Sequence, residues 1–400
     1  MHISFDISPV ILIFSAISLL FSAILIFWEY INIYFLKKSI KESEQLKSLN
    51  QERLKAKIDG VSVIIYCDND LKNLTQNLPA IINQDYPEFE IIIVNDGKNE
   101  AINDFINRMS IEYSNLHYSY TPDDARNLSR KKLALMIGIK AAKYDIIITT
   151  NSHCKPQSNH WISAIARHFL AETDIVIGYS RIADDCDTQK GHSFRYFSTL
   201  HDTIQYLVQA ICRKPYRGTS DNLAYRKDVF FKNKGFSRSM HLHHGEDDIF
   251  VNEIATHNNT KTEITPESLV ISHIDNATHS FLTLKLQRMF TERMFHSSAF
   301  ALGNLKTIIF YINFILLCGI AIADFSNIIV IAIPCLISII FTPLQIILHR
   351  KTADLLSYRK LSFSIPIYTF ILPISNLYYK LKSRRHTSFN YTWQPLKKRI

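Results

Sequence analysis

Glu90-Ile91-Ile92-Ile93-Val94-Asn95-Asp96-Gly97 is a short, nearly continuous apolar run that ends in a polar turn. Such a run is typical of a strand buried on both faces, as in a parallel sheet. Val61–Tyr66 is a second run of this kind, and Asp145–Thr149 is a third. Helical patterns lie between them, at Leu74–Asn83 and Lys131–Ala142. Strands and helices in alternation predict an α/β domain with a parallel sheet.

Polar clusters follow two of these strands directly. Asn95-Asp96-Gly97 follows the second strand, and Asn151-Ser152-His153 follows the third. In sheets of this type, ligands bind beyond the carboxyl ends of the strands. We therefore expect a site at this edge of the sheet, although Asp96-Gly97 on its own is more typical of a plain turn.

Further along, Gly245-Glu246-Asp247-Asp248 places three consecutive acids after a glycine and before an apolar pattern. Phe250 and Ile254 lie four residues apart, as on one face of a helix. Acids in the first turn of a helix face the positive end of its dipole, so the triplet alone predicts a helix N-terminus. The histidines of Met240–His244 predict a loop rather than a zinc site, because partners at ligand spacing are missing.

Both ends of the chain are apolar. Val10–Trp28 is a run of nineteen residues without a charge, long enough to span a bilayer. Lys37–Lys57 follows with seven Lys or Arg and three acids, which places the next domain in the cytoplasm by the positive-inside rule. Thr307–Ala323 and Ile328–Leu348 predict a membrane hairpin. Leu361–Leu377 contains two prolines and has basic residues on both sides, so it either lies in the interface or enters the membrane.

Composition narrows the class of protein. The formal charge of +9 is concentrated beside the apolar ends, which favours anionic lipid rather than nucleic acid as a partner. The six cysteines are scattered, as in a cytosol-facing protein with reduced thiols. The apolar runs contain no acid that could form a transport pathway, so a transporter is not favoured.

In their order and spacing, these motifs resemble the membrane-bound family 2 glycosyltransferases over more than half of the chain. The segments that carry the resemblance are Gln84–Pro87, Ile93–Gly97, Lys131–Ala142, Gly218–Lys227 and Gly245–Asp247. The resemblance implies a cytoplasmic α/β domain of the GT-A fold, a Rossmann-like nucleotide-diphospho-sugar transferase, with N-terminal and C-terminal transmembrane helices. It also implies inverting transfer of a sugar from a nucleotide sugar to a lipid-linked or membrane-proximal saccharide, for cell-envelope polysaccharide at the inner (plasma) membrane.

The resemblance also gives roles to the matching residues. Asp247 is expected to be the general base, with Glu246 or Asp248 orienting it or capping the helix. The residues expected to bind the donor or the acceptor are Asp96, Asn151, Asp221, Asn222, Gln287, Arg288 and Arg293. Taken alone, Arg288 and Arg293 are equally typical of contacts with lipid headgroups.

The chain departs from the family pattern at two places. Where the family has Asp-Ala-Asp-Cys, this chain has Asn151-Ser152-His153-Cys154, so both acids of the metal motif are missing. Phe290 stands where the family's Gln-x-x-Arg-Trp motif has arginine. We expect a divalent cation, Mn²⁺ ahead of Mg²⁺, with His153 as a ligand. The alternatives are direct binding of the diphosphate by His153 and Lys155, and a degenerate protein that binds nucleotide sugar or a partner without turnover.

The expected organisation has six segments. They are an N-terminal transmembrane anchor (1–35), a basic juxtamembrane linker (36–60), the GT-A domain (61–280), a membrane-proximal interface segment (281–304), a transmembrane hairpin (305–348), and an apolar segment with a basic tail (349–400).

Overall fold

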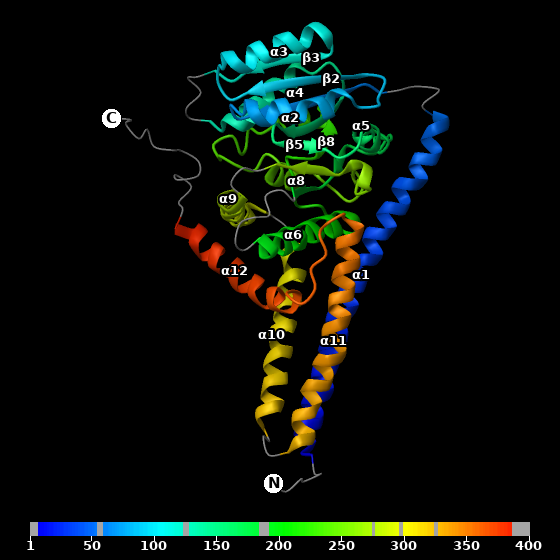
Figure 1. Ribbon diagram of the computed structural model, residues 1–400, viewed down its shortest axis with the longest axis vertical. Helices are drawn as coiled ribbons and strands as arrows, with labels where there is room; N and C mark the ends of the chain where they lie inside the picture. The colour runs from blue at the N-terminus through cyan, green and yellow to red at the C-terminus, as the bar shows by residue number, and fades with distance from the viewer. Residues whose placement is uncertain are drawn as a thin grey trace. The chain divides into compact units, whose positions relative to one another are not determined.

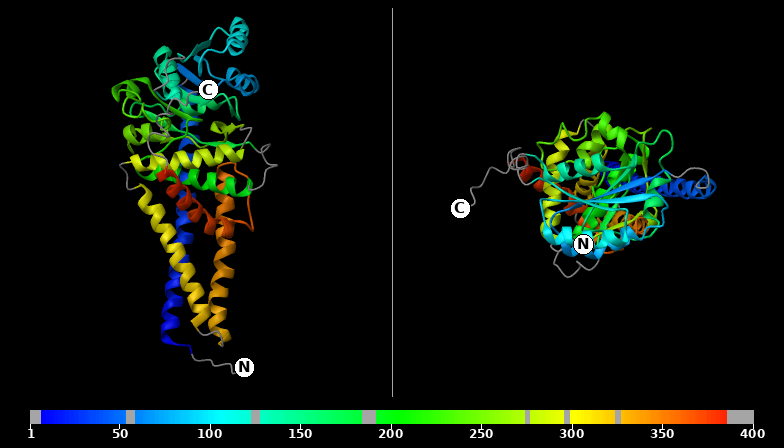
Figure 2. Two further views of the ribbon diagram at one scale, coloured as in Figure 1. Left: turned by 90° about the vertical axis from the view of Figure 1, so that its left-hand side faces the viewer. Right: turned by 90° about the horizontal axis from the view of Figure 1, so that it is seen from above.

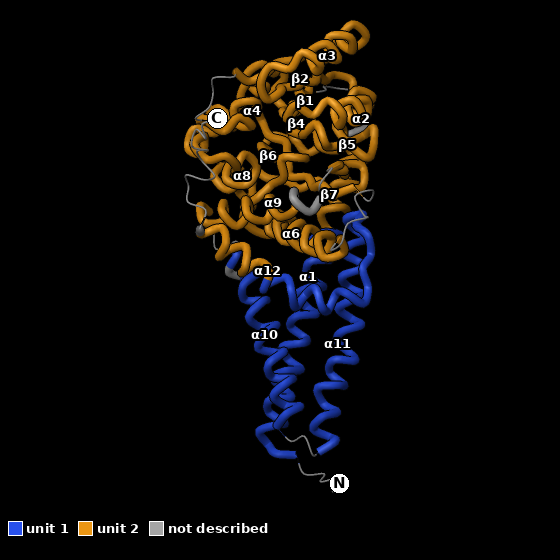
Figure 3. The backbone as a smooth tube through the Cα atoms, turned by 60° about the vertical axis from the view of Figure 1, so that its left-hand side comes forward, with its two compact units in different colours: residues 1–37, 297–374 blue, residues 38–296, 375–400 orange. Residues whose placement is uncertain are grey.

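The computed structural model describes residues 7–53, 59–122, 128–183, 192–273, 277–295, 299–323 and 327–385. It divides into two compact units, which Figure 3 colours separately. Unit 1 comprises residues 1–37 and 297–374, and unit 2 comprises residues 38–296 and 375–400. Unit 2 carries the α/β domain, and unit 1 consists of apolar helices.

The centre of unit 2 is a seven-stranded mixed sheet (Figure 1). Its strands, in spatial order, are β3 (Leu116–Tyr120), β2 (Phe89–Asn95), β1 (Val61–Cys67), β4 (Ile146–Asn151), β8 (Leu223–Arg226), β6 (Ile175–Ile177) and β9 (Thr260–Thr262). The first four run parallel, which confirms the arrangement expected from the apolar runs. β8 runs antiparallel to both of its neighbours, a feature that the sequence pattern did not predict.

The register of the central strands brings their polar ends to one edge. Cys67 of β1 lies beside Asn95 of β2, and Tyr66 of β1 lies beside Asn151 of β4. Every residue of β1 except Tyr66 is buried, and so is every residue of β4. Since a one-residue slip would turn these side chains to the other face, the apolar cores of the strands fix where their ends fall. The two predicted polar clusters therefore lie on either side of the end of β1.

Helices and a small second sheet complete unit 2. The helices are α2 (Leu71–Ile82), α3 (Glu100–Glu112), α4 (Arg130–Ala141), α5 (Trp161–Ala166), α6 (His192–Cys212), α7 (Lys227–Lys232), α8 (Asp248–Ile254) and α9 (Ala277–Thr291), with 3₁₀ turns η2 (Pro266–Ser268) and η3 (Glu292–Met294). The second sheet has the order β5 (Cys154–Pro156), β10 (Val270–Ser272) and β7 (Ser180–Ile182). As predicted, α2 continues through Pro79. Side-chain caps start α2 at Asp70 and α4 at Ser129.

Helix α1 (Pro9–Arg53) runs without a break across the boundary expected between anchor and linker. Its final part belongs to unit 2 and packs on the domain. Ser39 Oγ lies 2.8 Å from Thr262 Oγ1, and Ser43 Oγ lies 3.3 Å from His168 Nε2. One turn further on, Lys47 pairs with Glu267. The segment expected to be a linker is thus held on the domain by residues spaced four apart on one helix face.

Unit 1 contains α10 (Ala299–Ala323), α11 (Ile328–Leu355), the first part of α1 and the start of α12 (Ile365–Arg385). Among the described residues, three helices are long and apolar enough to cross a membrane, namely Pro9–Leu49, Leu302–Ala323 and Ile328–Leu355. α10 and α11 converge towards Ala323 and Ile328, as both views show (Figures 1 and 2). Residues 324–326, the expected hairpin turn, lie outside the described residues.

Polar contacts join α1 and α10 within unit 1. Ser18 Oγ donates to Asn313 Oδ1 at 2.7 Å, and Asn313 Nδ2 donates to Ser22 Oγ at 2.9 Å. Lys306 Nζ lies 2.5 Å from the Glu29 carboxylate. Side chains of this kind hold helices together in an apolar medium, where each polar group needs a partner.

Candidate functional site

Three parts of unit 2 meet at the carboxyl edge of the main sheet. They are the ends of β1, β2 and β4, the loop 218–222 before β8, and the loop 239–247 before α8. Asn151 Nδ2 donates to Asp221 Oδ1 at 2.7 Å, and the Ser220 backbone N–H donates to Asp247 Oδ2 at 3.0 Å. The structure therefore brings Asn151, Asp221 and Asp247 together, although they are far apart in the chain.

Asp247 caps the N-terminus of α8. Its carboxylate accepts hydrogen bonds from the backbone N–H groups of Asp248, at 2.8 Å, and Ser220. Burial raises the pKa of Asp247 to about 7, and the nearby carboxylates of Glu246 and Asp248 act in the same direction. The predicted cap and the carboxylate expected to act as a base are thus one residue.

Gly245 allows the turn that presents Asp247. Its φ is +105°, in a region that side chains with a Cβ rarely adopt. A Cβ at this position would also lie 2.5 Å from Ile249 Cδ1, inside the first turn of α8. The glycine of the motif is therefore required by the backbone and by the helix that follows.

Lys131 holds Glu246. Its ammonium lies 2.7 Å from Glu246 Oε1, donates to Ser220 Oγ at 2.9 Å and lies 5.5 Å from the centre of the Tyr66 ring. Burial opposes ionisation of Glu246, but Lys131, His244 and Lys132 together outweigh it and lower the pKa of this carboxyl. Among the described residues, Glu246 Oε2 has no hydrogen-bond partner, so this buried oxygen can accept from a bound hydroxyl.

Lys132 supports the loop before Asp247, and the motifs did not single it out. It is fully buried and donates to the carbonyl oxygens of Ser239, Leu242 and His244 at 2.6, 3.2 and 2.8 Å. Burial lowers the pKa of Lys132 to about 8. This single ammonium therefore fixes the loop that leads into Gly245.

Asp248 faces another element. Its carboxylate accepts from the Thr291 hydroxyl of α9 and, at 2.7 Å, from the Ile249 N–H. The Thr291 contact joins α8 to α9, and the Ile249 contact lies within the first turn of α8, so both oxygens of Asp248 are engaged in contacts of these helices.

Asp96, at the end of β2, pairs with Arg130 and accepts from Thr121 Oγ1 at 3.2 Å. Asp68, at the end of β1, is a second acid that the motifs did not indicate. Burial raises the pKa of Asp68, and the Asp96 carboxylate adds to the effect. Two acids thus lie close together at the ends of neighbouring strands, where they can accept hydrogen bonds from a base or a ribose.

His153, Cys154 and Asp221 form the part of the site that could hold a metal ion. The His153 ring nitrogen, the Cys154 sulfur and an Asp221 oxygen lie within 4.8 Å of one another. Ser180 Oγ donates to Asp221 Oδ2 at 2.7 Å, so Asn151 and Ser180 together orient this carboxylate. An imidazole, a thiol and one carboxylate suit a transition ion better than Mg²⁺, which prefers oxygen ligands.

Asn222, which was expected to bind the donor, makes its hydrogen bonds within the domain. The side chain is fully buried, and its Oδ1 accepts from Trp161 Nε1 at 3.1 Å. Its Nδ2 donates to the carbonyl oxygens of Tyr179 and Ser268 at 3.0 and 2.7 Å. With these partners, Asn222 joins loops of the domain and has no free donor for a ligand.

Gln287, Arg288 and Arg293 lie on α9 and η3. Arg288 Nη1 lies 3.0 Å from Asp202 Oδ2 of α6, and Arg293 Nη2 donates to Ser383 Oγ of α12 at 3.0 Å. Gln287 is half-buried, and its carbonyl accepts from Thr291 Oγ1 at 3.2 Å. Within the part of the chain that the structure describes, the two arginines thus contact α6 and α12 rather than the loops around Asp247.

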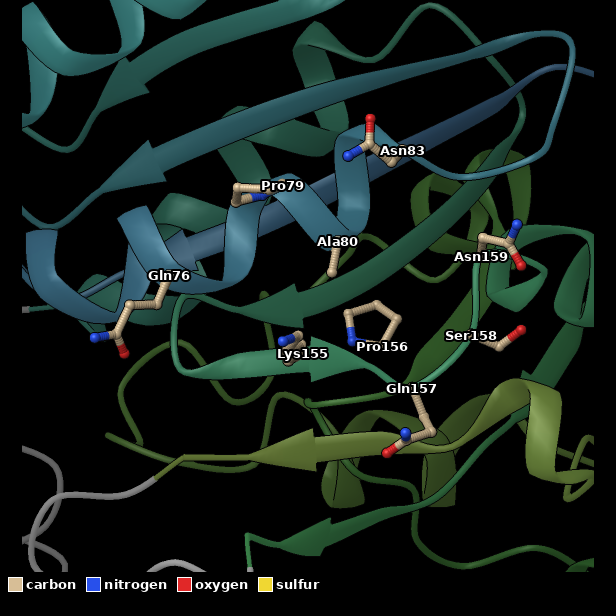
Figure 4. A pocket seen from close by; sticks show the side chains of 9 residues that line it. All are labelled: Gln76, Pro79, Ala80, Asn83, Lys155, Pro156, Gln157, Ser158 and Asn159. Carbon is tan, nitrogen blue, oxygen red and sulfur yellow. The ribbon is translucent and has the colours of Figure 1, made fainter.

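A pocket of about 300 Å³ lies between residues 76–83 of α2 and residues 155–159 (Figure 4). Lys155, the alternative diphosphate ligand, is one of the lining residues, and none of the other predicted site residues is. It is open and lined mainly by amide side chains and prolines, whereas the charged groups described above gather at the carboxyl edge of the sheet.

Comparison with known proteins agrees with this architecture. Residues 62–232 match the sequence profile of Glycosyl transferase family 2. A poly-β-1,6-N-acetyl-D-glucosamine synthase of Staphylococcus epidermidis is 30% identical over 127 residues, which cover 31% of this chain and 28% of that protein. A second sequence of the same name from S. epidermidis is 29% identical over 123 residues. The match thus spans less than a third of the length of these relatives.

Two solved structures are also similar. The mannosyltransferase PcManGT from Pyrobaculum calidifontis, in complex with GDP-Man and Mn²⁺, has a TM-score of 0.49 at 13% identity, covering 88% of this chain and 99% of that one. S. aureus TarS has a TM-score of 0.39 at 16% identity, covering 82% and 92%. The assignment depends on the family match and on the strand order, which confirm the expected GT-A class. Residues 62–232, which make up less than half of the chain, are thus matched to Glycosyl transferase family 2.

Proposed function

We propose that this protein is an inverting glycosyltransferase that moves a sugar from a nucleotide-sugar donor to a saccharide that is lipid-linked or close to the membrane. An inverting transfer needs one carboxylate to take a proton from the acceptor hydroxyl while the diphosphate leaves from the opposite side of the sugar. Asp247 is the observation that carries the proposal, because it combines the required group, orientation and basicity.

Two backbone N–H groups aim the Asp247 carboxylate. Its pKa, raised to about 7 by burial first, lies where a base is partly ionised at neutral pH and still accepts a proton readily. Glu246 is kept charged by Lys131, and its unpartnered oxygen can hold a sugar hydroxyl beside the base. These residues therefore support proton removal from a bound hydroxyl.

The donor is proposed to lie along the ends of β1, β2 and β4. Asp96 and Asp68 would accept hydrogen bonds from the base or ribose, and the diphosphate would extend towards His153. The chemistry that a divalent cation supplies when bound by His153, Asp221 and Cys154 is neutralisation of the charge that develops on the leaving diphosphate. Asn151 supports that set by orienting Asp221.

The proposed location is the cytoplasmic face of the inner membrane. Three helices of suitable length and composition support a membrane-bound protein, and the basic residues of 37–57 support a cytoplasmic domain. The proposed partners are nucleotide sugar, a saccharide or lipid-linked acceptor, and membrane lipids.

The test uses the full-length protein in detergent with a panel of nucleotide sugars, starting with donors of N-acetylhexosamines because of the name of the relative. Release of nucleotide is measured with and without saccharide acceptors. Release from one donor by the wild type, and its loss in Asp247→Asn, is the expected result. A donor that binds tightly but is never turned over with any acceptor would instead make the chain a binding protein.

A further inference from the structure

A second group of charges is joined to the N-terminus of α8 through Asp248 and Thr291. We call Arg217, Lys285, Arg288, Asp202 and Glu292 the Arg217 cluster. Lys285 Nζ lies 2.8 Å and Arg288 Nη1 lies 3.0 Å from the same oxygen of Asp202. These contacts connect α6 to α9, and the glycosyl-transfer chemistry proposed above does not use them.

Arg217 is the unusual member of the cluster. Only 5% of its side chain is exposed, yet among the described residues its Nε and Nη2 have no hydrogen-bond partner. Its charged neighbour, Glu292 Oε1, is 3.7 Å from Nη2, which is an ion pair without a hydrogen bond. The guanidinium lies 5.6 Å from the Tyr216 ring centre and 5.8 Å from that of Phe295. A buried arginine normally has its donors satisfied, so this one lacks an acceptor.

Carboxylates surround Arg217 without accepting from its free donors. Lys285 and Arg288 share the Asp202 carboxylate, and Glu292, Asp248 and Asp202 favour the charged form of Arg217, whose pKa is raised. Arginine does not lose its proton in proteins, so the positive charge of Arg217 persists. Among the described residues, Nε and Nη2 remain without an acceptor, and an anion that accepts from both would remove the cost of these buried, unsatisfied donors.

The cluster is also accessible. Arg288 and Glu292 each keep 16% of their side chains exposed. Lys380 of α12 is exposed and contributes a further positive charge towards Glu292. An anion can therefore reach the cluster past these residues, with two guanidinium groups to receive it.

We propose that the Arg217 cluster binds a phosphate group, and that this is the phosphate by which the acceptor saccharide is attached to its lipid. Guanidinium groups bind phosphate with paired hydrogen bonds, which matches the free Nε and Nη2 of Arg217. Arg217 immediately precedes Gly218–Asp221, the loop whose Ser220 N–H holds Asp247. A phosphate at Arg217 would thus place the adjoining saccharide near the base. This assignment rests on the proposed function for the identity of the acceptor.

Position in the chain supports a lipid as the source of the phosphate. Glu292 and Phe295 lie a few residues before α10, which begins at Ala299 and is apolar enough to cross a membrane. A ligand with an apolar tail and a phosphate head would suit a site that precedes a membrane helix so closely.

The experiment measures equilibrium binding to the full-length protein in detergent by isothermal titration calorimetry, without turnover. The probes are farnesyl phosphate and farnesol, which differ only in the phosphate, and UDP as a diphosphate without lipid. The variants are Arg217→Gln, Arg217→Lys and, as a matched control, Arg108→Gln, which removes an exposed arginine on α3. Thermal unfolding of each variant reports whether it is folded.

The wild type should bind farnesyl phosphate about tenfold more tightly than farnesol, and Arg217→Gln should remove that preference. Arg217→Lys should retain part of it, and Arg108→Gln all of it. Equal binding of the two probes by the wild type would overturn the proposal, even if Arg217→Gln does not fold. Unchanged preference in folded Arg217→Gln would do the same.

Weaker UDP binding in Arg217→Gln, with farnesyl phosphate unaffected, would overturn the lipid assignment and identify the donor diphosphate as the anion. None of these outcomes depends on sugar transfer. A protein that prefers farnesyl phosphate but releases no nucleotide from any donor would refute the proposed function and leave the phosphate site standing.

Discussion

Two partly buried carboxylates, Asp247 and Asp221, lie at the same edge of one sheet, and their surroundings shift their pKa values in opposite directions. Asp247 is held by backbone N–H groups, and burial together with two neighbouring carboxylates raises its pKa to about 7. Burial also opposes ionisation of Asp221, but His153, Ser180 and Lys131 together outweigh it and hold the pKa of Asp221 well below its usual range. Ser220 connects the two carboxylates, because its backbone N–H donates to Asp247 and the residue directly precedes Asp221 in the chain.

The contrast separates two tasks. A carboxylate that must take a proton needs a raised pKa, and one that must stay charged needs partners that favour the ion. The surroundings of Asp247, which we call the Asp247 corner, are therefore suited to proton transfer. The group of Asp221, His153 and Cys154, which we call the Asp221 corner, is suited to holding charge. Changing one corner should affect the rate of chemistry, and changing the other should affect dependence on a cation.

The largest effect is expected for Asp247→Asn. Asparagine is also a good N-cap, so the helix should remain, while the proton acceptor is lost. Turnover should fall by roughly 10²–10⁴, with little change in donor affinity. Steady-state kinetics and donor titration measure the two quantities, with Asp228→Asn, an exposed residue of α7, as the control. Normal turnover in Asp247→Asn together with loss in Asp248→Asn would show that the base is the next residue.

His153→Ala tests the other corner. Removing the imidazole should lower activity by roughly 10–100-fold and weaken the response to Mn²⁺, which we expect to exceed the response to Mg²⁺. His257→Ala, outside the site, is the control. Activity is assayed across a series of Mn²⁺ and Mg²⁺ concentrations and in excess chelator. Full activity in chelator would exclude a required metal, and full activity in His153→Ala would also exclude direct binding of diphosphate by this residue.

The difference between the corners also shows what the sequence could and could not predict. The strands β1, β2 and β4 and their polar ends followed from apolar runs, because burial on both faces leaves a strong local signal. The acids of residues 246–248 followed from their position before a helical pattern. These features depend on neighbours in the chain, so they are visible in the sequence.

Contacts between residues far apart in the chain could not be predicted from the sequence. Asp221 lies near His153 because β8 pairs antiparallel with β4, and no local sequence pattern predicts that pairing. Asp221 and Asn222 were expected to act together, but adjacent side chains outside a helix tend to point in opposite directions, so one faces the site and the other is buried. Lys131 and Lys132 differ in the same way, since residues adjacent on a helix face different sides.

Lys132→Met tests how strongly the loop before Asp247 depends on the Lys132 ammonium for its stability. Methionine keeps the apolar stem but leaves the carbonyls of Ser239, Leu242 and His244 without their shared donor. The free energy of unfolding should fall by about 1–3 kcal/mol, the usual penalty for unsatisfied buried groups. Denaturant unfolding of the full-length protein measures it, with Lys140→Met, an exposed residue of the same helix, as the control. A stability equal to that of the control would mean that the loop is fixed by other contacts.

The smallest effect is a shift in pH dependence. Because Asp247 must be ionised to act as a base, kcat/KM of the wild type should rise as the pH increases through about 7. Glu246→Gln removes a negative neighbour that raises the pKa of Asp247, and it frees the positive charge of Lys131, which lowers that pKa. Both changes act in one direction, so the rise should move to lower pH by about one unit. Glu112→Gln, an exposed change on α3, should leave the profile in place. An upward shift, or no shift in a variant that still turns over, would mean that Asp247 is not the group whose ionisation limits the reaction.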